Sequence, residues 1–151
     1  MSNEFNDYQK YKWFFTSTGK LVVGGKSSIQ NDELLKKLKR SGREHVIMHT
    51  SAPGSPFSII IADIKEVKPS DVEETAIFTG CFSRAWREKK KKAQIDIFKL
   101  SQVYKTRLMN VGTWGVKGPI QRSSVKLELV LTTQEGKLRA VPEKTAKKKE
   151  I

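Results

Sequence analysis

The sequence has 151 residues, a formal net charge of +13, one cysteine and two histidines. This length suffices for one domain with a hydrophobic core, and no apolar run approaches the roughly 20 residues that a transmembrane helix needs. The single cysteine, Cys81, excludes a disulfide framework within the chain and is typical of a reducing compartment, so we expect a cytoplasmic protein.

The positive charge is distributed unevenly along the chain. Residues 84–107 hold nine Lys or Arg residues against two acidic ones, whereas residues 46–83 have a net negative charge. A second excess of Lys and Arg lies between residue 108 and the C-terminus. Such segregation favours a polyanionic partner, nucleic acid ahead of a membrane surface.

After a flexible lead-in over residues 1–9, the run from 13 to 34 predicts a β-hairpin followed by a helix. The β-rich triplets WFF and LVV flank a turn sequence, TSTG. A serine cap after Gly24, Gly25 and Lys26 starts the helix, and Ser41-Gly42 ends it. A phosphate could bind at this helix start, but a Walker-type loop is disfavoured because its spacing requires a glycine where Lys20 stands.

The middle of the chain predicts two more strands and a second helix. Strands are expected at residues 45–49 and 57–62, separated by a loop. A Ser70–Glu73 capping box predicts a helix over residues 71–89, with Trp86 on its apolar face in the core. Ala76, Gly80 and Ser83 are small residues about one turn apart, so we expect a sheet to approach this helix closely.

The last third of the sequence predicts β-structure. Strand-like patterns occur at residues 95–97, 100–104 and 111–116, and residues 125–131 alternate as in a half-buried strand. Residues 134–137 predict a turn, and residues 142–151 a basic, disordered tail. Together these elements predict one α+β domain over residues 10–141, a curved, mainly antiparallel sheet with its two principal helices on one side.

The sequence offers no catalytic constellation and no metal site. His45 and His49 lie about 13 Å apart if their segment is a strand, and no cysteine or carboxylate cluster supplies further ligands. We therefore interpret both histidines as structural. No serine lies in a nucleophile elbow, so a non-enzymatic protein without a cofactor is expected.

Basic residues give the strongest functional signal. Lysine and arginine side chains neutralise phosphates, and a neighbouring aromatic ring can stack on an unpaired base. The candidate nucleic-acid contacts are Lys26, Arg84, Arg87, Lys89, Lys90, Lys91, Lys92, Lys105, Arg107 and Lys117.

Four ordered segments resemble the NFACT RNA-binding domain over roughly residues 10–120. They are WFFTSTGKLVVGGKSSIQNDELL, HVIMHTSAPGSPFSIII, ETAIFTGCFSRAW, and KAQIDIFKLSQVYK followed by GTWGVKG. The loop after His49 is one residue shorter than in common versions, and His45 stands where an acidic residue often occurs. The resemblance assigns these residues to the motif loops: Gly24, Gly25, His49, Pro53, Gly54 and Ser55.

The resemblance implies binding of tRNA or ribosomal RNA in translation or ribosome-associated quality control, with the large ribosomal subunit as a partner and no membrane. The other modules of full-length family members are not found in these 151 residues, so we expect an accessory RNA-binding protein without their tailing activity. Two alternatives stay open. One is a protein-interaction module that docks on a ribosomal protein, and the other is an RNA- or nucleotide-directed enzyme that uses His49.

Overall fold

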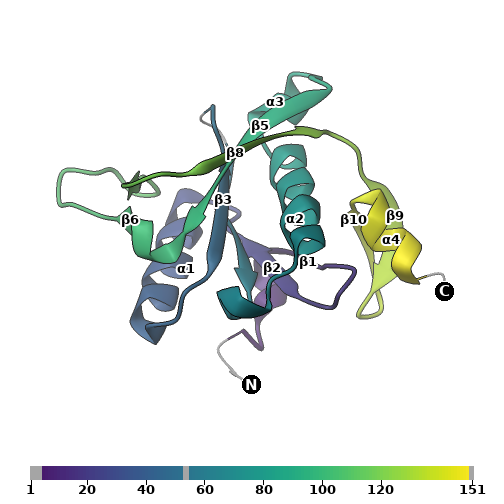
Figure 1. Ribbon diagram of the computed structural model, residues 1–151, viewed down its shortest axis with the longest axis horizontal. Helices are drawn as coiled ribbons and strands as arrows, with labels where there is room; N and C mark the ends of the chain where they lie inside the picture. Colours follow the sequence, from purple (N-terminus) through teal and green to yellow (C-terminus); the bar gives the residue numbers. More distant parts are fainter. Residues whose placement is uncertain (1–4, 53–54, 150–151) are drawn as a thin grey trace.

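Six antiparallel strands form one sheet in the order β1-β2-β4-β3-β5-β8 (Figure 1). The computed structural model describes residues 5–52 and 55–149. The strands are β1 (Lys12–Phe15), β2 (Leu21–Gly24), β3 (Val46–Thr50), β4 (Ser58–Ile61), β5 (Lys92–Lys99), β6 (Val103–Tyr104), β7 (Gly115–Val116), β8 (Gln121–Lys126), β9 (Val130–Gln134) and β10 (Lys137–Val141). The helices are α1 (Ser28–Ser41), α2 (Pro69–Cys81), α3 (Arg84–Arg87) and α4 (Glu143–Lys149), with short 3₁₀ turns at Tyr8–Lys10, Ile64–Glu66 and Leu100–Gln102. The α+β prediction is therefore confirmed.

The β1–β2 hairpin and α1 form as the local sequence predicts. Gly19 closes the hairpin turn at φ 87°, in the left-handed region that glycine tolerates. The side chain of Ser27 accepts a hydrogen bond from the backbone N–H of Gln30, and Gly42 ends α1 with φ 74°. These are the serine N-cap and glycine C-cap typical of stable helix ends.

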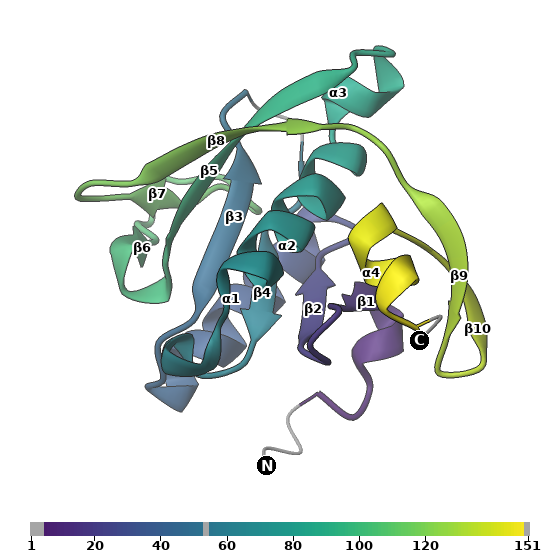
Figure 2. The ribbon, with the colours of Figure 1, turned by 45° about the vertical axis from the view of Figure 1, so that its right-hand side comes forward.

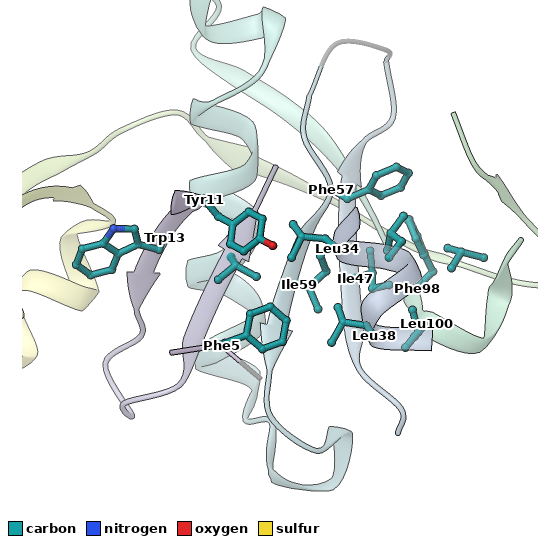
Figure 3. Close-up of a cluster of buried hydrophobic side chains, with 13 residues drawn as sticks. Phe5, Tyr11, Trp13, Leu34, Leu38, Ile47, Phe57, Ile59, Phe98 and Leu100 are labelled. Atoms are coloured by element: carbon teal, nitrogen blue, oxygen red, sulfur yellow. The ribbon is translucent and has the colours of Figure 1, made fainter. Parts of the chain in front are cut away.

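The two principal helices lie on opposite faces of the sheet, so the prediction of two helices on one side is wrong. Trp13 packs on the α1 face and its neighbour Phe14 on the α2 face, because successive strand residues point in opposite directions. Figure 3 shows the α1 side, where Leu34 and Leu38 face the sheet. Both faces of the central strands are buried, which requires continuous apolar runs rather than alternation.

The predicted helix over residues 71–89 is divided into α2 and α3. Helix α2 starts two residues early, and the Asp71 carboxylate accepts the backbone N–H of Lys68 at 2.9 Å, so the capping residue is not Ser70. The chain leaves α2 after Cys81. Ser83 then donates to the Gly80 carbonyl at 2.6 Å and accepts the N–H of Ala85 at 3.2 Å, so its side chain ends one helix and caps the next.

The strand predicted over residues 125–131 is likewise interrupted. Strand β8 ends at Lys126, and β9 begins at Val130 in a separate hairpin with β10. Leu127, in the break, lies against Gly80 of α2, where an added Cβ would come within 2.7 Å of its methyl group. Ile95 and Val125 of the sheet lie 3.5 Å from the same added Cβ, as expected for a sheet that approaches the small residues of α2. The turn at residues 134–137 is confirmed, with φ 51° at Glu135 and 73° at Gly136.

The C-terminal hairpin and α4 pack beside α2 and β1 (Figure 2). The Gln134 side-chain amide accepts the N–H of Phe15 and donates to its carbonyl, both at 2.8 Å. Thr145 of α4 is buried and donates to the Glu74 carboxylate at 2.6 Å. The tail expected to be disordered is thus helical over Glu143–Lys149, because Glu74 and an apolar face receive it. At the other end, Phe5 of the expected flexible lead-in is buried in the core.

Over the described residues, no helix has the length and apolar character required to cross a bilayer.

Candidate nucleic-acid interface

A cavity of about 490 Å³ opens where β1, the start of α1 and the short helix α3 meet. We call it the cationic pocket, because Lys12, Lys26 and Arg87 line it. Its remaining lining is polar or apolar without a carboxylate: Gly25, Ser27, Ser28, Asn31, Ser55, Pro56, Cys81, Phe82, Ser83 and Trp86. Three positive charges around one hollow make an environment that attracts an anion.

The cations of this pocket repel one another. Partial burial lowers the pKa of Lys12, and the charges of Lys26 and Arg87 lower it further. The Lys12 ammonium lies 4.5 Å from the centre of the Phe82 ring. Within residues 5–52 and 55–149, none of the three cations forms an ion pair with a carboxylate. An anionic ligand would therefore relieve repulsion that the fold leaves in place.

Trp86 lies at the rim of the cationic pocket, so the prediction that it packs in the core is wrong. Its side chain is 47% exposed, because the break at Ser83 places α3 beyond the end of α2. An exposed tryptophan between cations is a common component of single-stranded nucleic-acid sites, where its ring stacks on a base.

A second hollow of about 380 Å³ lies on the other side of α3. Arg84, Lys90 and Lys92 line it, together with residues 50–52 of the loop after β3. Ser83 lines both hollows, so the two adjoin at the start of α3. Lys89 adopts φ 60° in the turn between α3 and β5, and the exposed lysines at 89–92 follow this turn into the strand.

The motif loops border the same region. Gly25 packs so closely on α1 that an added Cβ would lie 2.8 Å from the backbone nitrogen of Asn31, and Gly24 lies against the Phe57 carbonyl. Ser55 accepts the N–H of Thr50 at 3.0 Å and lines the cationic pocket. The predicted loop residues Pro53 and Gly54 lie outside the described residues.

Both histidines have partners within the fold. His45 is buried, and its Nδ1 donates to the carbonyls of Ile60 and Ala62 at 3.1 and 3.0 Å. His49 donates from Nδ1 to the Thr50 carbonyl at 2.7 Å and packs on Phe57, and burial lowers its pKa. Among the described residues, no group of three His, Cys, Asp or Glu side chains could hold a metal ion.

The remaining predicted contacts lie at the other end of β5, in a segment of residues 103–120 that we call the arm (Figure 1). Lys105 is used internally: its ammonium donates to the carbonyls of Asn110 and Thr113 at 2.6 and 2.8 Å and lies 3.4 Å from the Asp32 carboxylate. Arg107 is exposed, and the ammonium of Lys117 lies over the Tyr104 ring.

Asp32 of α1 anchors this arm. Its carboxylate accepts the indole N–H of Trp114 at 2.8 Å and the backbone N–H of Gly112 at 3.0 Å. Burial acts to raise the pKa of Asp32, but these hydrogen bonds and the charge of Lys105 together lower it. The arm is therefore tied to α1 by a carboxylate that stays ionised.

The structure thus gathers most of the predicted contacts around α3 and separates the others. Lys26, Arg84, Arg87 and the lysines at 89–92 lie around the two hollows, whereas Lys105, Arg107 and Lys117 lie on the arm. The sequence analysis missed Lys12. A lysine between Tyr11 and Trp13, both buried, was the available signal, because a charge within an apolar strand needs a polar opening beside it.

These features define a small α+β domain with a basic, aromatic-bearing end suited to a polyanion. The profile of the NFACT protein RNA binding domain matches residues 10–118, and the chain belongs to this family.

Curated relatives share a limited part of their length with this chain. The archaeal Rqc2 homolog aRqcH of Methanocaldococcus jannaschii is 36% identical over 80 residues, which cover 53% of this chain and 12% of the relative. The ribosome quality control complex subunit NEMF of mouse and of human is 26% identical over 80 residues, or 52% of this chain and 7% of NEMF.

A solved structure shares the fold. The C-terminal part of the fibronectin/fibrinogen-binding protein from Streptococcus suis superposes with a TM-score of 0.63 at 17% identity, covering 77% of this chain and 44% of that one.

Proposed function

We propose that this chain is a non-catalytic RNA-binding domain that acts in translation, in the cytoplasm, as part of ribosome quality control. Family membership supports RNA as the ligand, and the relatives named for ribosome quality control support the process. The observation that carries the proposal is the grouping of cations around α3, of which, among the described residues, only Lys90 forms an ion pair with a carboxylate. Transfer RNA and ribosomal RNA of the large subunit are the ligands we propose.

The lysines at 89–92 and the two arginines of α3 supply the main phosphate contacts in this proposal. Their side chains are exposed on a turn and a strand start that hold their backbone in place. Among the described residues, Lys90 forms one ion pair, with the Glu88 carboxylate at 3.5 Å. This pair is exposed, so a phosphate can easily replace it.

Arg107 and Lys117 form a second contact for RNAs that reach the arm. The eight residues of β5 separate the two ends by about 26 Å, at roughly 3.3 Å per residue. A folded RNA can span this distance, whereas an RNA of three or four nucleotides held at α3 cannot. Lys105 serves the fold rather than the ligand, because its three donors already have acceptors in the arm and α1.

Salt dependence of RNA binding tests the proposal. Affinity for tRNA and for ribosomal RNA fragments is measured between 50 and 300 mM KCl, and the logarithm of the association constant should fall linearly with the logarithm of the salt concentration. Replacing the four lysines at 89–92 with glutamine should reduce the slope by about 3, since each phosphate contact contributes roughly 0.7–0.9. An unchanged slope would show that these lysines do not hold the RNA.

A matched control uses the arm. The double change Arg107→Gln/Lys117→Gln removes two exposed charges from the other end of β5. It should weaken tRNA binding and leave the binding of a four-nucleotide RNA unaffected. Co-sedimentation with ribosomal subunits, repeated after nuclease treatment, separates RNA binding from docking on a ribosomal protein: persistence of the complex after RNA digestion would favour the protein partner.

The His49 enzyme hypothesis gains no support from the site. A catalytic base needs a ring nitrogen that can reach substrate, and the His49 ring is mostly enclosed, with Nδ1 already bonded to Thr50. Its packing against Phe57 fits a residue that holds the loop after β3 in place.

A further inference from the structure

Three cavities adjoin one another around Lys12 and α3. The cationic pocket shares Ser83 with the second hollow. On its other side it shares Lys12, Lys26 and Phe82 with a third cavity of about 520 Å³, which Arg139 also lines. The three cavities are therefore a series of neighbouring hollows, with cations in the lining of each and Trp86 in the lining of the cationic pocket.

Arg139 extends the series without being free to move. Its guanidinium donates to the Trp13 carbonyl at 2.6 Å and lies 4.1 Å from the centre of the Trp13 ring. Burial lowers its pKa, and its Nε is buried without a hydrogen-bond partner among the described residues. It therefore adds a fixed positive charge at one end of the series.

We propose that the cationic pocket holds one unpaired nucleotide of an RNA strand that runs along these hollows, with its phosphate between Lys12, Lys26 and Arg87 and its base stacked on Trp86. This inference rests on the proposed RNA-binding function and specifies its ligand as single-stranded RNA. The cavity volume lies within the roughly 300–1,000 Å³ of pockets that enclose a small ligand.

The shape and the charges favour a single strand over a duplex. In A-form RNA the bases are stacked inside the helix, so a protein surface meets phosphates and 2′-hydroxyls, and an exposed tryptophan ring has no base to stack on. A recessed set of three cations beside an aromatic ring suits a backbone that can bend into the pocket. The mutual repulsion of Lys12, Lys26 and Arg87 is relieved when one phosphate binds among them.

Fluorescence anisotropy with two labelled RNAs tests this proposal. One is a 12-nucleotide single strand without internal pairing, and the other is a blunt 12-base-pair duplex. The wild type should bind the single strand at least tenfold more tightly. Trp86→Ala should reduce single-strand affinity about tenfold, as base–aromatic stacking predicts, and leave duplex affinity unchanged, whereas Trp86→Phe should retain affinity within threefold.

Lys12→Met provides a second, independent measure. It should lower the salt dependence of single-strand binding by about one ion, because one phosphate contact is lost. Leu108→Ala is the matched control for an exposed side chain, since Leu108 is 95% exposed on the arm. Binding of a single strand should also quench tryptophan fluorescence in the wild type and not in Trp86→Phe.

The outcomes separate this inference from the function on which it rests. If the wild type binds neither RNA, the proposed function fails. If it binds RNA but Trp86→Ala weakens both ligands equally or neither, the single-nucleotide pocket is wrong while RNA binding stands. Inorganic pyrophosphate at millimolar concentration serves as the last probe: full competition with the single strand in both wild type and Trp86→Ala would indicate a simple anion site.

Discussion

At one end of β5, Lys12, Lys26 and Arg87 border a hollow whose lining contains no carboxylate. At the other end, Lys105 has an aspartate and two carbonyls around its ammonium. Both ends combine lysine with tryptophan, since Lys105 lies 5.6 Å from the centre of the Trp114 ring. The difference between them lies in whether the fold supplies the cation with acceptors.

This contrast indicates which basic residues are available to a ligand. A lysine whose donors are already satisfied gains little from a phosphate, because one set of hydrogen bonds only replaces another. A lysine held near other cations gains both hydrogen bonds and relief of repulsion. The pocket and the arm therefore predict opposite consequences for stability and binding when their charges are removed.

The largest expected effect is at the anchor of the arm. Asp32→Ala leaves the Trp114 and Gly112 N–H groups and the Lys105 ammonium without their carboxylate, so the free energy of unfolding should fall by about 3 kcal/mol. Urea denaturation measures it. Glu33→Ala, a change at the next residue, exposed on the surface, should cost less than about 0.5 kcal/mol. Equal losses in the two variants would contradict the anchoring role of Asp32.

A pair of lysine variants sharpens the comparison. Lys105→Met should reduce the free energy of unfolding by about 1–2 kcal/mol and leave single-strand RNA affinity unchanged, because this ammonium serves the arm. Lys12→Met should raise stability by a few tenths of a kcal/mol, since it removes repulsion and a thioether can take the place of the ammonium over the Phe82 ring, and should weaken RNA binding. If Lys12→Met instead lowered the free energy of unfolding and left RNA affinity unchanged, Lys12 would serve the fold rather than the ligand.

The smallest expected effects are changes in stability with pH, one below pH 7 and one above it. The pKa of Asp32 is lowered below its ordinary value of 3.8, so its stabilising contribution is complete above that value and is lost as the pH falls below it. The stability difference between wild type and Asp32→Asn should therefore shrink as the pH falls through about 4. Thermal unfolding of both proteins from pH 3 to 7 measures this.

For Lys12 the pH effect has the same direction as for Asp32 but a different cause. Its pKa is lowered below 10.5, so the unfolded chain binds more protons in the window just beneath that value, and wild-type stability gains as the pH rises through it. The stability advantage of Lys12→Met over wild type should decline in the same window. An advantage that grew with pH would be inconsistent with repulsion at Lys12.

Local signals in the sequence predicted the β1–β2 hairpin and α1 well. Gly19, Ser27 and Gly42 act within a few residues of their own positions, so turn and cap chemistry is sufficient to predict them. The sequence analysis did not predict that the helices lie on opposite faces of the sheet. The continuous apolar runs WFF and LVV nevertheless indicate strands that are buried on both faces.

Two of the errors share a cause, because each depends on a contact distant in sequence. The break between β8 and β9 follows from Leu127 packing on Gly80, and α4 forms where Thr145 meets Glu74. The candidate site follows the same rule, because Lys105 is paired within the fold by Asp32, a residue 73 positions away in the sequence. No pattern within either segment carries that information.

The Gln134 amide has a consequence for how the chain is synthesised. Strand β1 is the edge of the sheet, and an open edge is a template for pairing with another molecule. The side chain that occupies this edge lies 119 residues after Phe15, the residue that it pairs with. Because β1 is synthesised before Gln134, a nascent chain exposes the unpaired edge of β1 until those 119 further residues have been made. In the folded chain, the β9–β10 hairpin therefore protects the edge of the β1–β2 hairpin from pairing with another molecule.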